Sequence, residues 1–210
     1  MNDTIYALSS APGRAGVAVI RVSGPAARVC LSLLSGSDPA PPREAVLRTL
    51  RDARGAPIDR ALLLWFPAPA SFTGEDVVEF HVHGGRAVLD RVLEVLAEVS
   101  SCRPAEPGEF TRRAVENGKL DLTQAEALID LIDAETEAQR IQALRQFGGS
   151  LSALYEDWRL RLVKVLAWAE AEIDFSDEDL PADLSVRTRR DLLDISQEIQ
   201  KHISDSRRGE

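Results

Sequence analysis

Three ionisable side chains alternate along one short segment and could together bind a ligand. In the run Val77-Val78-Glu79-Phe80-His81-Val82-His83, the alternation of a β-strand places Glu79, His81 and His83 on one face. Spacing alone favours a polar outer surface. A metal site is less favoured, because no further set of ligands accompanies the two histidines. The third interpretation is recognition of a planar heterocycle, since a carboxylate accepts two parallel hydrogen bonds from the N–H and amino edge of a pterin.

Two cationic side chains are further candidates for ligand contacts. Arg21 interrupts the apolar run Val17–Val22, and is either the charged tip of a strand or a contact. Lys119 lies just before a predicted helix, and is either a solvated lysine at a domain junction or a contact. The surrounding Asn117-Gly118-Lys119-Leu120-Asp121 looks like the guanine-specifying Asn-Lys-x-Asp of GTPases. Its glycine breaks that spacing, and the sequence contains no Gly-x-x-x-x-Gly-Lys-Ser/Thr phosphate loop. We single out no catalytic residue.

The elements that must position these residues fall into two parts. Residues 1–118 are predicted to form an α+β domain, a mixed sheet with helices packed on it. The predicted strands are 17–22, 46–51, 60–66 and 77–83, and the predicted helices are 26–34 and 86–99. Asp52 to Gly55 is predicted to be a hairpin turn, and Pro39, Pro41 and Pro42 mark a loop.

Residues 119–210 change to a helical period. Thr123 and Glu126 match a capping box at the start of the first helix. Three apolar stripes follow, made of Leu128, Leu131, Ala134, Ala138, Ile141 and Leu144; of Leu151, Leu154, Trp158, Leu162, Val165 and Ala169; and of Leu192, Ile195, Ile199 and Ile203. Gly148-Gly149 is expected to interrupt or weaken the helix, and an acidic loop is predicted from Asp174 to Pro181. This part is predicted to be an all-α, incomplete helical bundle.

Composition excludes several classes of protein. The net charge of −9 disfavours a general nucleic-acid surface, which needs clustered Lys and Arg. The two cysteines, Cys30 and Cys102, are expected to be packing residues in a reducing setting. We expect no signal peptide, no membrane span and a cytoplasmic location.

Four motifs carry a resemblance to a known family. They are Pro12–Arg21, Ser71–Gly85, Arg103–Thr111 and Asn117–Asp133. In this order they resemble the amino-terminal half of the MnmE (TrmE) tRNA-modification GTPases, and the resemblance covers nearly all 210 residues.

The resemblance implies a fold similar to tetrahydrofolate-binding aminomethyltransferase domains. It also implies homodimerisation through residues 1–118 and binding of 5-formyl- or methylene-tetrahydrofolate. The family's folate contacts match Arg21, Glu79 and Lys119. A further contact near the family's carboxy terminus, and its terminal Cys-x-Gly-Lys motif, have no counterpart in this sequence.

The resemblance further implies a role in modifying carbon 5 of the wobble uridine of certain tRNAs. In the family this needs an MnmG-like, FAD-dependent partner, and GTP with Mg²⁺ and K⁺ in a domain absent from this sequence. Two alternatives stay open: a stand-alone folate-dependent one-carbon transferase, and a non-catalytic dimerisation adaptor.

Overall fold

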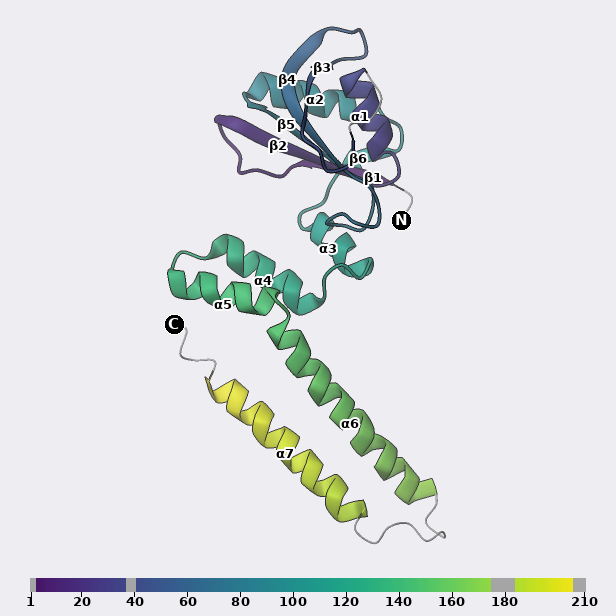
Figure 1. Cartoon of the computed structure of the whole chain (residues 1–210), viewed down its shortest axis with the longest axis vertical. Helices are drawn as coiled ribbons and strands as arrows, with labels where there is room; N and C mark the ends of the chain where they lie inside the picture. Colours follow the sequence, from purple (N-terminus) through teal and green to yellow (C-terminus); the bar gives the residue numbers. More distant parts are fainter. Residues whose placement is uncertain (1–2, 37–40, 175–183, 206–210) are drawn as a thin grey trace. The chain divides into compact units, whose positions relative to one another are not determined.

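The protein consists of two compact units, residues 1–120 and 121–210. A computed structural model describes residues 3–36, 41–174 and 184–205, and Figure 1 shows the chain. Pro39 and most of the predicted acidic loop lie outside the described residues, whereas Pro41 and Pro42 lie in no helix or strand, as predicted. None of the described helices is long and apolar enough to cross a membrane.

The first unit contains a six-stranded mixed sheet with strand order β3-β4-β5-β2-β1-β6. All neighbours are antiparallel except β1 and β6, which are parallel. The strands are β1 (Thr4–Leu8), β2 (Ala15–Ser23), β3 (Val46–Arg51), β4 (Pro57–Phe66), β5 (Val77–Gly84) and β6 (Cys102–Pro104). The helices are α1 (Ala27–Ser35), α2 (Arg86–Ala97) and α3 (Glu109–Glu116). This arrangement confirms the predicted α+β class.

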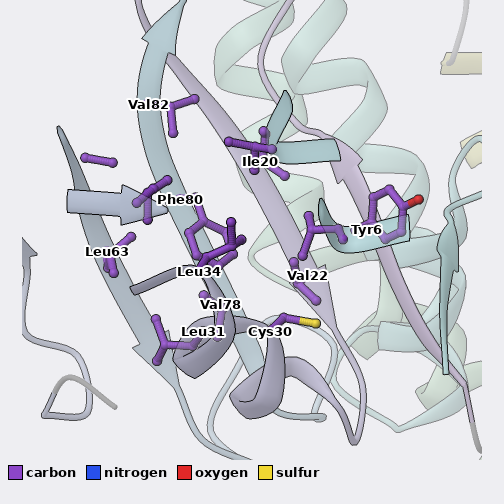
Figure 2. Close-up of a cluster of buried hydrophobic side chains, with 14 of the residues drawn as sticks. Tyr6, Ile20, Val22, Cys30, Leu31, Leu34, Leu63, Val78, Phe80 and Val82 are labelled. Atoms are coloured by element: carbon purple, nitrogen blue, oxygen red, sulfur yellow. The ribbon is translucent and has the colours of Figure 1, made fainter. Parts of the chain in front are cut away.

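The core of this unit lies on one face of the sheet, under α1 and α2. Alternate residues of the central strands, such as Ile20 and Phe80, are fully buried there, together with Leu31 and Leu34 of α1. Figure 2 shows these side chains meeting between the strands and α1. The alternation that buries Phe80 turns its neighbours Glu79 and His81 to the opposite face. Apolar packing on one face therefore fixes which side of the sheet carries the polar residues.

The predicted elements of this unit are confirmed with small changes at their ends, but three elements were not predicted. The hairpin turn is present, because the backbone N–H of Gly55 donates to the Asp52 carbonyl and the Asp52 carboxylate accepts from Arg54 and Ala56. The missed elements are β1, β6 and α3. Helix α3 carries mostly polar residues, and charges rather than an apolar stripe hold it in place.

A buried charge network fastens α3 to the rest of the unit. Arg113 is 1% exposed, and its guanidinium donates to Asp3 Oδ1 (2.9 Å), Glu109 Oε1 (3.1 Å) and Glu75 Oε1 (3.1 Å). Arg103 also donates to both oxygens of Glu109, at 2.6 and 2.9 Å. The hydrogen bonds from Arg103, with those from the Glu106 backbone and Arg113, lower the pKa of Glu109 from 4.5 to about 2. Three separate segments thus meet around one buried cation.

The second unit consists of two helical hairpins. Helices α4 (Leu122–Asp133) and α5 (Glu137–Phe147) form one, and α6 (Ser150–Asp174) and α7 (Leu184–Asp205) the other (Figure 1). Gly149, at φ +85°, separates α5 from α6, so the double glycine does interrupt the helix. The acidic loop was predicted to begin at Asp174, but that residue is the last of α6.

Two predictions about the helix ends were wrong. The first capping box is formed by Asp121 and Gln124, not by Thr123 and Glu126. Asp121 is the better placed acceptor, and the Thr123 hydroxyl donates to it instead. The first apolar stripe is also divided between two helices, because Thr136 and Gln139 form a second capping box. The hydroxyl of Thr136 competes for backbone amides that a continuous helix would use.

The apolar stripes of this unit are only partly covered. Trp158 and Val165 of α6 and Ile195 of α7 are buried. Leu162, Leu192 and Ile203 of the same stripes are 40%, 48% and 62% exposed. The stripes therefore pack against one another in part and leave the remainder of their apolar surface open.

Glu109 should make the stability of the first unit depend on pH. Its folded pKa lies below its ordinary value, so its contribution is complete above pH 4.5 and is lost as the pH falls toward 2. We expect Glu109→Gln to lower the free energy of unfolding at pH 7 by about 2–4 kcal/mol, since it leaves buried Arg113 short of a charge.

Urea unfolding between pH 7 and pH 3 measures this difference. The control is Glu106→Gln. It removes the ion pair between Glu106 and Arg112, whose side chains are 62% and 50% exposed, and it should change the free energy of unfolding little. A difference between wild type and Glu109→Gln that stays constant over this range would contradict the assignment.

Candidate functional site

An ion pair between β2 and β5 lies at the centre of the polar face. Arg21 and Glu79 are directly opposite each other in the register of the two strands. The Arg21 guanidinium donates from Nη2 and Nε to Glu79 Oε1, at 2.8 and 3.0 Å. Their side chains are 26% and 16% exposed, so the pair is partly desolvated and still reachable from solvent. The structure therefore brings together two of the three residues that the sequence indicated.

The second oxygen of Glu79 contacts the next residue on the same face. His81 Nε2 lies 3.2 Å from Glu79 Oε2. The predicted alternation is confirmed, because Glu79 and His81 are half-buried and His83 is exposed, whereas Val78, Phe80 and Val82 are buried. Each carboxylate oxygen has two lone pairs, and Oε1 already accepts two hydrogen bonds from Arg21, so the remaining capacity of Glu79 to accept lies on Oε2.

His83 belongs to a different pair. Its ring Nδ1 lies 2.8 Å from Asp59 Oδ1, and its backbone N–H donates to Asp59 Oδ2. Burial would raise the pKa of Asp59, but the hydrogen bonds from the His83 backbone and side chain outweigh it and hold that pKa below its ordinary value. The two histidines therefore pair with different carboxylates, His81 with Glu79 and His83 with Asp59. In the part of the chain that the structure describes, no group of three or more His, Cys, Asp or Glu side chains could hold a metal ion.

Two phenyl rings flank the Arg21 guanidinium. Its Cζ lies 5.4 Å from the centroid of Phe72 and 5.7 Å from that of Phe110. Phe72 belongs to the loop between β4 and β5, and Phe110 to α3. Both are half-buried and contribute a flat apolar border beside a charged pair. Sequence reasoning missed them, although a phenylalanine within an otherwise polar stretch, as in Ser71-Phe72-Thr73, was a usable signal.

Lys119 lies in the segment that follows α3. It is exposed, and its backbone N–H donates to the Ala114 carbonyl. A Cβ placed on Gly74 would lie 3.2 and 3.3 Å from Lys119 Cγ and Cδ, so the lysine stem covers the loop that also carries Phe72. Among the described residues, no hydrogen bond joins Lys119 to the Arg21–Glu79 pair. Lys119 is linked to the Arg21–Glu79 pair through its packing on that loop.

The two cysteines pack together beneath the opposite face. Cys30 is buried in the core, Cys102 packs against it, and their Sγ atoms are 3.4 Å apart. Burial, with the neighbouring Cys102, raises the pKa of the Cys30 thiol. Their predicted role as packing residues is confirmed.

The polar face thus carries a hydrogen-bonded carboxylate bordered by two phenyl rings, and the stem of an exposed lysine packs on the loop that carries one of these rings. These groups suit recognition of a ligand that has a flat heterocycle at one end and negative charge at the other.

Comparisons with known proteins agree with the division into two units. Residues 4–119 match the family model described as GTP-binding protein TrmE N-terminus, and residues 122–210 match the MnmE helical domain. A tRNA modification GTPase MnmE from Parvibaculum lavamentivorans is 59% identical over 209 residues, which are 99% of this chain and 48% of that protein. The same-named protein from Caulobacter vibrioides is 56% identical, over 100% of this chain and 46% of its own length.

A eukaryotic relative matches over the same region. The 5-taurinomethyluridine-[tRNA] synthase subunit GTPB3, mitochondrial, from Danio rerio is 53% identical over 100% of this chain and 42% of its own length. The chain therefore spans about half the length of these relatives. Matches to both family models in consecutive order, with identities above 50%, show that the chain belongs to the MnmE (TrmE) family of tRNA modification GTPases.

Proposed function

We propose that the first unit binds a reduced folate, 5-formyl- or methylene-tetrahydrofolate, at the Arg21–Glu79 pair. The observation that carries this proposal is the half-buried carboxylate of Glu79, held by Arg21 at 2.8 Å and bordered by two phenyl rings. A pterin offers an N–H and amino edge to such a carboxylate and a flat face to such rings.

Arg21 and Lys119 have different roles in this proposal. Arg21 orients the Glu79 carboxylate through the two hydrogen bonds that it donates to Oε1. Lys119 is exposed at the edge of the loop, where its ammonium group can approach the carboxylates of the folate's glutamate tail. The ligand would supply the one-carbon unit, while the residues of this chain bind and orient it.

A second proposal concerns homodimerisation through the first unit. Leu47 and Leu62 are paired neighbours on β3 and β4, and each is 45% exposed. Leu62 is also the register partner of His81 on β5, so this apolar patch adjoins the polar face. A second copy of the chain would bury these leucines beside the site. This observation favours a dimer over a monomeric stand-alone transferase. Folate binding would rule out the second alternative, a non-catalytic dimerisation adaptor.

In the complete protein, we propose that this half serves modification of the wobble uridine of tRNA at carbon 5. Three relatives carry names that refer to tRNA modification or to a modified tRNA uridine. The proposal includes an MnmG-like, FAD-dependent partner, tRNA as the substrate of the joint complex, a cytoplasmic location, and GTP, Mg²⁺ and K⁺ bound outside residues 1–210. The remaining chain of the complete protein would also cover the open apolar surface of α6 and α7.

Folate binding should depend on the Glu79 carboxylate. We expect 5-formyl-tetrahydrofolate to bind the unmodified chain, and Glu79→Ala to weaken binding by on the order of 1.5–3 kcal/mol, the scale of a charge-assisted hydrogen bond. Isothermal titration calorimetry measures both. His83→Ala is the matched control, since His83 lies on the same strand face but pairs with Asp59. Absence of binding by the unmodified chain at a ligand concentration of ~1 mM would refute the proposal. A dissociation constant of that size corresponds to a binding free energy of only about −4 kcal/mol.

The chain should neither bind nor hydrolyse GTP. Hydrolysis needs a cradle of backbone amides and a lysine around the phosphates, and the sequence contains no such motif. We expect no phosphate release above background with Mg²⁺ and K⁺ present, and no calorimetric signal with GTP. Micromolar affinity for GTP would show that the sequence pattern has been misread.

The second unit should be the less protected part of the isolated chain. Fewer apolar contacts oppose the local opening of α6 and α7 than that of β2 and β5, so their amides should exchange faster. Hydrogen exchange followed by mass spectrometry tests this, and light scattering reports association through the open surface. Uniformly strong protection of α4 to α7 in a strict dimer would show that this unit is complete by itself.

A further inference from the structure

The loop between β4 and β5 carries Phe72 to the candidate site, yet it lies outside the pairing of the sheet. Polar contacts hold it in place. The hydroxyl of Ser23 lies 2.7 Å from Thr73 Oγ1 and 2.7 Å from Glu75 Oε2. On the other side, the Asn117 side-chain amide donates to the Thr73 carbonyl at 2.7 Å. The loop is therefore fixed to β2 and to the end of α3 at once.

Arg113 strengthens the attachment of this loop to α3. It donates to both oxygens of Glu75, at 3.1 and 3.2 Å, while its other contacts reach Glu109 and Asp3. Because Arg113 is 1% exposed, water cannot replace these partners without opening the unit. The loop and α3 thus form one rigid piece at this point.

The close approach at Gly74 links this piece to Lys119. Gly74 has φ +80°, and a Cβ there would lie 3.1 Å from Asn117 Cβ and 3.2 Å from Lys119 Cγ. The loop passes directly against the residues that follow α3. A shift of the loop would consequently displace Phe72 from Arg21 and Lys119 from its place in the same movement.

We propose that Asn117 is a positioning residue of the ligand site. Together with the buried Arg113, it holds the loop of residues 71–75 against α3, so that Phe72, Lys119 and the Arg21–Glu79 pair converge on one ligand. Asn117 does not contact the ligand itself. This inference rests on the proposed folate site for its ligand, but the attachment of the loop is a property of the free protein.

Asn117→Asp tests the inference with little change of shape. It replaces the amide donor by a carboxylate, which cannot donate to the Thr73 carbonyl at neutral pH. Glu116→Ala is the matched control, because Glu116 is the adjacent exposed residue at the end of the same helix. Arg113 is unsuitable for the test, since removing a buried cation with three carboxylate partners is expected to unfold the unit.

Two measurements then separate positioning from general stability. Without ligand, hydrogen exchange of residues 71–76 should accelerate in Asn117→Asp and stay unchanged in Glu116→Ala, while both variants keep the melting temperature of the unmodified protein. With 5-formyl-tetrahydrofolate, the affinity of Asn117→Asp should fall about tenfold, as for the loss of one organising hydrogen bond.

Each contrary result has its own meaning. Unchanged exchange in the loop of Asn117→Asp would show that Asn117 does not hold it. Faster exchange with unchanged folate affinity would overturn the positioning role and leave the proposed function intact. If the unmodified protein does not bind folate, the proposed function is wrong, and the proposed role of the loop in binding is wrong with it.

Discussion

The buried guanidinium of Arg113 is the constraint on which the first unit depends. A guanidinium that is 1% exposed needs acceptors in place of the water it has lost, and the carboxylates of Asp3, Glu75 and Glu109 accept from its two Nη groups. These residues belong to the segment before β1, the loop before β5, and α3 itself. Satisfying one charge therefore requires three distant parts of the sequence to meet. The same requirement places α3, which lacks a broad apolar stripe, against the segment before β1 and the loop before β5.

The candidate site follows from two independent kinds of interaction. Apolar packing of Ile20 and Phe80 under α1 and α2 turns Arg21 and Glu79 to the opposite face, where they pair across β2 and β5. The charge network then brings Phe110, on α3, and Phe72, on the loop, to the same guanidinium. The apolar packing therefore positions the hydrogen-bonding carboxylate, and the charge network positions the two phenyl rings beside it. A ligand that needs both is recognised only when the whole unit is folded.

The sequence predicts the elements whose pattern is local and misses those whose placement depends on distant partners. The alternation in β5 and the turn at Asp52 to Gly55 each rest on neighbouring residues, and both were predicted. The short strand β6 exists because β1 lies beside it, and α3 is held by charges from far along the chain, so neither has a strong local pattern. Glu79 was identified by its strand position. The convergence of Phe72 and Phe110 on Arg21 needs the folded loop, and spacing alone cannot show it.

The central claim is that the polar face of the sheet, with its attached loop, is a folate site. Hydrogen exchange of the 210-residue protein with and without 5-formyl-tetrahydrofolate tests it most directly, because it locates the ligand on the chain. The account predicts that the ligand slows exchange in β2, in β5, in residues 71–76 and in residues 117–119, and leaves α4 to α7 unchanged. Slowed exchange confined to α4–α7, or no change anywhere at saturating ligand, would contradict it.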